Sequence, residues 1–173
     1  MKNFVLLLIL CCLQLSSCKK ENDTEKSDRK IELYLLKSFT KAANGYAINI
    51  NSVVLNDTAL IKYEDIQWYD SVNYTFKISD KPAIWLNDVQ HNQTHERAFA
   101  ITIEKRIIYT GYFWAGFSSA ICDWIVIDPL NYSGKNELTV NLGYPGLMPG
   151  MNITDKRNDK ELLEILRLDK KLK

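Results

Sequence analysis

The sequence predicts an α+β fold: a mainly antiparallel sheet with short helical turns, and a C-terminal amphipathic helix packed on it. Apolar and polar residues alternate in several short segments, which is the pattern of strands that bury one face. Turn signals such as Asn44-Gly45 and Asp128-Pro129 separate these segments. Apolar residues recur at helical spacing only after residue 158, so the helix is expected to follow the strands.

Seven segments are expected to form strands. They are residues 31–36, 52–55, 73–78, 98–103, 107–113, 121–127 and 137–142. Residues 104–106 are a polar connection of hairpin length, and the later strands are expected to form an antiparallel meander. Residues 63–69 are expected to form a short helical turn, because Asp65 can cap a helix and Ile66 and Tyr69 are three residues apart.

The closing helix is predicted from its cap and its spacing. Asn158 with Glu161 three residues later forms a variant of the capping box. Apolar residues then recur at Leu162, Leu163, Ile165 and Leu166. Basic residues within 167–173 suit the negative end of the helix dipole. A helix lying on the sheet is expected, rather than one that binds a partner or a membrane.

The N-terminal residues have the parts of an export signal. Residues 4–13 are apolar, follow Lys2, and precede Leu15-Ser16-Ser17-Cys18. This arrangement is typical of a secretory signal, and the run is too short to span a membrane, which needs about 20 apolar residues. Residues 15–18 resemble the bacterial lipobox. The resemblance implies that residues 1–17 are a lipoprotein signal peptide and that Cys18 receives lipid. An ordinary signal peptide is the alternative.

A lipid on Cys18 implies a membrane partner, held through acyl chains such as palmitate. Lys19 after the cysteine resembles the pattern of lipoproteins sorted to the outer membrane, which is therefore the expected location; the side that the domain faces is left open. Residues 19–30 carry no apolar side chain, so residues 18–30 are expected to be a flexible tether. Residues 31–173 are expected to form a single globular domain.

Composition and cysteine usage exclude several classes of function. The formal net charge is +1, with acidic and basic residues interspersed, so no nucleic-acid partner is expected. Cys122 is the one predicted thiol of the mature chain, and its apolar neighbours favour a buried packing residue over a nucleophile. His91 and His95 have the spacing of metal ligands on a helix, but their polar neighbours favour an exposed loop. No metal or cofactor is therefore expected.

Several short segments are similar to those of a group of small uncharacterised lipoproteins of Bacteroidetes. They include Tyr34-Leu35-Leu36-Lys37, Tyr109-Thr110-Gly111-Tyr112-Phe113-Trp114, Gly143-Tyr144-Pro145-Gly146 and Arg157-Asn158-Asp159. This resemblance implies no known activity. Residues 60–66 also resemble a segment in the periplasmic head region of the export accessory protein SecD, which implies a fold fragment and a role near polypeptides.

Aromatic residues concentrate between residues 109 and 124. On a strand, Tyr109 faces one side of the sheet, and Tyr112 and Trp114 face the other. Both faces are expected to be core; the alternative is a candidate binding surface formed by Tyr109, Tyr112, Trp114 and Trp124. The favoured function is a non-catalytic module that binds an envelope protein, peptide or glycan. The alternative is an envelope hydrolase with a carboxylate pair that the sequence does not reveal.

Overall fold

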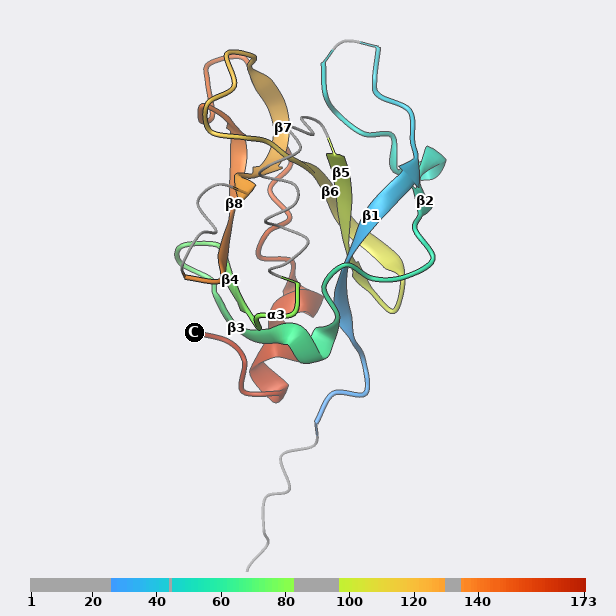
Figure 1. Cartoon of the computed structure of the whole chain (residues 1–173), viewed down its shortest axis with the longest axis vertical. Helices are drawn as coiled ribbons and strands as arrows, with labels where there is room; N and C mark the ends of the chain where they lie inside the picture. The colour runs from blue at the N-terminus through green and yellow to red at the C-terminus, as the bar shows by residue number, and fades with distance from the viewer. Residues whose placement is uncertain (1–25, 44, 83–96, 130–134) are drawn as a thin grey trace, which may run out of the picture.

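The computed structural model describes residues 26–43, 45–82, 97–129 and 135–173. One sheet of eight mostly antiparallel strands dominates this part of the chain, and one α-helix lies near the C-terminus (Figure 1). The predicted α+β class, with strands predominating, is therefore confirmed. Cys18, His91 and His95 lie outside the described residues.

Seven of the eight strands follow the predicted segments with changes in their ends, and β3 lies where a helical turn was predicted. They are β1 (Ile31–Ser38), β2 (Val54–Leu55), β3 (Ile66–Asp70), β4 (Thr75–Ile78), β5 (Arg97–Ile103), β6 (Arg106–Phe113), β7 (Cys122–Ile127) and β8 (Glu137–Tyr144). The short helices are η2 (Ile50–Ser52) and η3 (Tyr63–Asp65), and the α-helix is α3 (Lys160–Leu168). The order of the strands in the sheet is β2-β1-β5-β6-β7-β8-β4-β3.

The predicted antiparallel meander is wrong at β6 and β7. These strands run parallel, with Tyr112 opposite Val126 and Phe113 opposite Ile127. The pairing covers only the last residues of each strand. The loop of residues 114–121 therefore returns the chain from the end of β6 to the start of β7, over about the length of β7. The other neighbouring strands in the sheet pair antiparallel.

The hairpin between β5 and β6 is confirmed and is tighter than predicted. Its two turn residues, Glu104 and Lys105, have φ values of 49° and 62°. Positive φ at both central residues is the geometry of a type I′ turn, whose twist matches the twist of the flanking strands. Arg106, expected in the connection, is instead the first residue of β6.

The expected helical turn over residues 63–69 is only partly correct. The turn η3 ends at Asp65, and the chain continues as β3. The pairing of β3 with β4 shifts between Ile66 and Trp68, which inserts an extra residue in β3. This irregularity explains how Ile66 and Tyr69, three residues apart, are both buried in the core. A bulged strand thus produced the spacing that we interpreted as helical.

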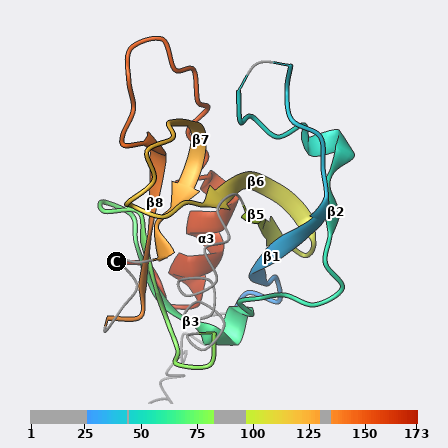
Figure 2. The same ribbon diagram turned by 45° about the horizontal axis from the view of Figure 1, so that its top comes forward.

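The helix α3 lies between the β1 and β3 sides of the curved sheet (Figure 2). Leu162, Ile165 and Leu166 are fully buried and belong to the same core cluster as side chains of seven strands. The predicted cap is displaced by one residue, because Asp159 rather than Asn158 accepts the backbone N–H of Glu161, at 3.0 Å. The Asn158 side chain instead accepts the hydroxyl of Tyr69.

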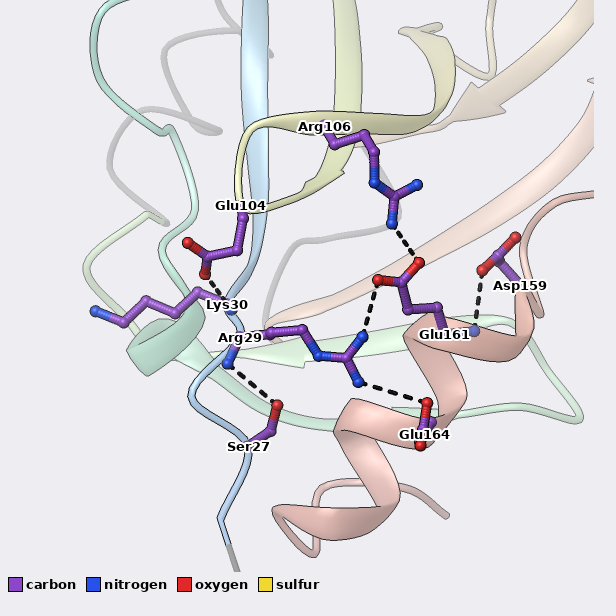
Figure 3. Close-up of polar contacts among 8 residues, drawn as sticks. All are labelled: Ser27, Arg29, Lys30, Glu104, Arg106, Asp159, Glu161 and Glu164. Atoms are coloured by element: carbon purple, nitrogen blue, oxygen red, sulfur yellow. Dashed lines mark hydrogen bonds and ion pairs between the residues drawn. The ribbon is translucent and has the colours of Figure 1, made fainter.

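The N-terminal segment contacts the rest of the domain through residues that the sequence assigned to the tether of residues 18–30 (Figure 3). The guanidinium of Arg29 forms ion pairs with Glu161 and Glu164 on α3, at 2.9 and 3.4 Å. The backbone N–H of Ser27 donates to Asp169, and that of Lys30 donates to Glu104. The segment therefore contacts the domain through the guanidinium of Arg29 and through backbone N–H groups, and these contacts reach back to Ser27.

Candidate functional site

A cleft of about 470 Å³ lies where the ends of β6, β7 and β8 meet the segment that precedes α3. This volume falls in the range of clefts that bind small molecules. The lining residues are Trp114, Val126, Asp128, Asn141, Leu142, Gly143, Tyr144, Pro145, Gly146, Leu147 and Arg157. The wall thus combines apolar side chains with several polar groups.

Arg157 is the charged residue held most firmly in this wall. Only 9% of Arg157 is exposed. Its Nε and Nη2 donate to the two carboxylate oxygens of Asp155, at 2.9 and 2.7 Å, and its Nη1 donates to the carbonyl of Val140 at 3.0 Å. The ring of Tyr74 stacks on the guanidinium, with its centroid 3.5 Å from Cζ. These contacts hold the fork of the guanidinium in one orientation.

The ion pair also sets the charge of its carboxylate. Hydrogen bonds from Arg157 hold the pKa of Asp155 below its usual range. The positive charge of Arg157 persists at every physiological pH. The pair therefore places a fixed cation in the wall of the cleft and leaves its partner carboxylate outside the lining residues.

Trp114 contributes a buried polar atom to the same wall. The residue is 1% exposed, and its ring meets that of Tyr46 edge to face, with centroids 5.0 Å apart. Its backbone N–H donates to the carbonyl of Ile127, which fixes the chain at the end of β6. Within the described part of the chain, its indole Nε1–H has no acceptor.

Two loops form the mouth of the cleft. The hydroxyl of Tyr144 donates to the carbonyl of Gly116, which ties the loop of residues 114–121 to the loop after β8. Gly143 has a φ of 74°, and a Cβ there would lie 2.8 Å from the carbonyl oxygen of Gly146, so the tight turn requires glycine. Three large apolar side chains are exposed on these loops, Phe117 at 60%, Ile121 at 52% and Leu147 at 59%, and of these Leu147 lines the cleft.

The candidate binding surface predicted from the aromatic residues is not a surface. Tyr109, Tyr112 and Trp114 are buried, and Trp124 is half-buried with its Nε1 donating to Thr110. Tyr109 belongs to one core cluster, and Tyr112 and Trp114 to a second. The sheet is therefore covered on both faces here, as expected from the aromatic residues on both sides of this strand. Of the four residues, Trp114 alone lines the cleft.

Sequence reasoning missed Arg157 and the loop apolar residues. Arg157 lies in a polar stretch, and nothing in that stretch distinguishes a buried arginine from an exposed one. Phe117 and Ile121 lie in the aromatic region between residues 109 and 124, but the candidate surface predicted there consists of other residues. Residues in loops carry no periodicity from which exposure can be inferred.

The remaining candidates differ in their outcome. Cys122 is fully buried, which confirms the packing role predicted for it. Within residues 26–43, 45–82, 97–129 and 135–173, no group of three or more His, Cys, Asp and Glu side chains is placed to hold a metal ion. No helix in these ranges is long and apolar enough to cross a membrane.

Comparison of the chain with protein-family models, with curated proteins and with solved structures found no match. The resemblances to Bacteroidetes lipoproteins and to the SecD head region therefore stay predictions.

Proposed function

We propose that this protein is an envelope lipoprotein, anchored through lipid on Cys18, whose domain is a non-catalytic module that binds a ligand in the cleft beside Arg157. The observation that carries the binding role is the cleft itself, which combines apolar and polar groups in its wall, a fixed cation, and the exposed apolar side chain of Leu147. Exposed apolar groups rimmed by polar residues are typical of interaction sites. The proposed location is the outer membrane.

The position of the loops relative to the N-terminal segment supports this arrangement. Ser27 and Arg29 contact α3 and the residue that ends it, at the lower end of the molecule in Figure 1. The loops that carry Phe117 and Leu147 lie at the upper end. An anchor attached before Ser27 would therefore join the domain at the end opposite these loops, and a peptide, protein or glycan of the envelope could reach them.

The proposal includes the amphipathic nature of α3 and its packing on the sheet. Leu162, Ile165 and Leu166 are buried, whereas Glu164 and Arg167 are exposed, which supports it. The helix would then be part of the scaffold that holds Arg157, since Arg157 lies three residues before the first residue of α3.

The alternative of an envelope hydrolase stays a prediction with less support. Glycoside hydrolysis uses two carboxyl groups that flank the substrate. Among the described residues that line the cleft, Asp128 is the one carboxylate. A single carboxylate suits recognition better than this chemistry.

Two experiments test the proposed function. For the anchor, mass spectrometry of the mature protein should find acyl chains on Cys18, and Cys18→Ala should remove the protein from the membrane fraction or leave it uncleaved. An unlipidated mature N-terminus in the wild type would contradict the anchor.

For the binding role, the purified protein is used to capture components of an envelope extract. Leu147→Glu and Phe117→Ala should lose a captured component that the wild type retains. The matched control is Ile50→Glu, because Ile50 is also an exposed apolar residue but lies on η2, away from the cleft. Equal capture by the loop variants and the control would contradict binding at this cleft.

A further inference from the structure

Arg157 keeps donor hydrogens that nothing in the described part of the chain accepts. A guanidinium carries five N–H groups. In Arg157 the Nε–H and one Nη2–H go to Asp155, and one Nη1–H goes to Val140, which uses three of the five. One N–H therefore remains on each of the two terminal nitrogens. Both belong to a residue that lines the cleft.

A further donor lies in the same wall. The indole Nε1–H of Trp114 is buried and has no acceptor among the described residues. Buried N–H groups are almost always paired in folded proteins, so this donor is open to an acceptor on a bound molecule. Trp114 and Arg157 thus both carry N–H donors that have no acceptor among the described residues.

The charge and shape of the cleft restrict the acceptor. Two N–H groups on the two terminal nitrogens of a guanidinium match the two oxygens of a carboxylate. A dianion such as phosphate would be repelled by the carboxylate of Asp128 in the wall, whereas a single negative charge is opposed less. Leu142, Pro145 and Leu147 supply an apolar wall beside these polar groups.

We propose that the cleft binds a carboxylate carried on an apolar group, with Arg157 holding the carboxylate. This inference rests on the proposed function, a binding module, and names its class of ligand. Since Asp155, Val140 and Tyr74 already hold the guanidinium, little rotamer freedom is lost on binding. A free small acid and the C-terminus of a peptide present the same chemistry, and the experiment below separates them.

The test compares N-acetyl-leucine with N-acetyl-leucinamide, which has nearly the same shape but no charge. Each is titrated into the ¹⁵N-labelled full chain in detergent. The Nε1–H signal of Trp114, identified by its loss in Trp114→Phe, and the Nε–H signal of Arg157 are followed. The acid should shift both signals saturably and bind about tenfold or more tightly than the amide. Equal binding of acid and amide, or no saturable shift with either, would overturn the proposal.

A second pair of probes identifies the source of the carboxylate. A hexapeptide ending in leucine and its C-terminal amide are titrated in the same way. Tighter binding of the peptide acid than of N-acetyl-leucine assigns the site to a chain end, and the reverse assigns it to a small acid. Both results support the carboxylate, provided that each acid binds more tightly than its amide.

Variants then assign the effect to the cleft. Arg157→Lys keeps the charge but loses the fork, and Arg157→Met loses both, so each should weaken binding of N-acetyl-leucine by about tenfold or more. The matched control, Arg167→Met, removes an exposed arginine from α3 and should leave the affinity unchanged. Unchanged affinity in a folded Arg157→Met protein would overturn the proposal.

Because Arg157 is buried, its variants can fail to fold, and Leu147 provides a variant at an exposed position. Leu147→Glu and Leu147→Gln lose the same apolar contact, and only Leu147→Glu adds a negative charge at the mouth. Relative to Leu147→Gln, Leu147→Glu should therefore bind the acid more weakly and the amide equally. Equal affinity of both variants for the acid would overturn the proposal. Capture of an envelope component that depends on the loops but is not displaced by N-acetyl-leucine would overturn the carboxylate alone and leave the proposed function in place.

Discussion

The hydroxyl of Tyr63 donates a hydrogen bond of 2.6 Å to Asp169, the residue that ends α3. The other carboxylate oxygen of Asp169 accepts the backbone N–H of Ser27 at 2.8 Å. The side chain of Lys171 donates to the carbonyl of Tyr63 and lies over its ring. One carboxylate thus joins the turn before β3, the N-terminal segment and the end of the helix.

Removing the hydroxyl in Tyr63→Phe should lower the free energy of unfolding by about 1 to 3 kcal/mol, the range for a hydrogen bond to a charged group. Chemical denaturation measures this change. In Asp169→Asn the same bond is weakened, so the double variant should lose less than the sum of the two single losses. Fully additive losses would show that the bond contributes nothing to stability.

The same pair predicts behaviour at alkaline pH. Burial, with the hydrogen bond to Asp169, raises the pKa of Tyr63 above its usual value of about 10. The unfolded chain then loses this proton before the folded chain does, so the stabilisation is complete below about pH 10 and is lost as pH rises further. The stability difference between wild type and Tyr63→Phe should therefore shrink above about pH 10. A difference that is constant with pH would contradict the pKa shift.

Hydrogen exchange should change abruptly at Ser27. The backbone N–H groups of Ser27, Arg29 and Lys30 donate to side chains of Asp169, Ser27 and Glu104. These amides should exchange measurably more slowly than those of residues 19–26, which belong to the same predicted tether of residues 18–30, in an experiment resolved by residue. Arg29→Ala should reduce the protection of these amides while lowering global stability by only about 1 kcal/mol or less, because its ion pairs are partly exposed. Complete exchange within seconds at all three amides would support a tether that extends to Lys30.

Trp114 and Phe117 should respond in opposite ways to truncation. Trp114 is 1% exposed and lies in a core cluster, so Trp114→Ala should lower the free energy of unfolding by about 3 to 5 kcal/mol. Phe117 is 60% exposed, so Phe117→Ala should change it by about 0.5 kcal/mol or less. Thermal and urea denaturation compare the two. A Trp114→Ala protein as stable as the wild type would contradict the core position of Trp114.

Cys122 should behave as a packing residue. Its thiol is fully buried, so iodoacetamide should label it only after the domain unfolds. Cys122→Ser should lower stability by about 1 to 3 kcal/mol, because the hydroxyl is more costly to bury than the thiol. Cys122→Ala, which adds no polar group, is the control. Rapid labelling of the native protein would contradict the packing role.

The strands were predictable wherever alternation reflects burial. The segments that became β1, β5, β6, β7 and β8 were found within a few residues, because each places large apolar side chains toward the core. The bulge in β3 was not predictable, since one extra residue converts a spacing of two into a spacing of three. The parallel pairing of β6 with β7 was missed because the length of a loop does not specify the direction in which the chain returns.

The sequence by itself determined the class of the fold, the hairpin at Glu104 and Lys105, the burial of Cys122 and the helix near the C-terminus. Each of these depends on residues that are close in the chain, whose spacing and backbone preferences can be read locally. Only the tertiary structure decided that Arg157 lies in the wall of a cleft with Trp114, and that Arg29 pairs with α3. These contacts join residues that are distant in sequence. A polar side chain has many possible partners, and only the fold decides which of them lies within reach.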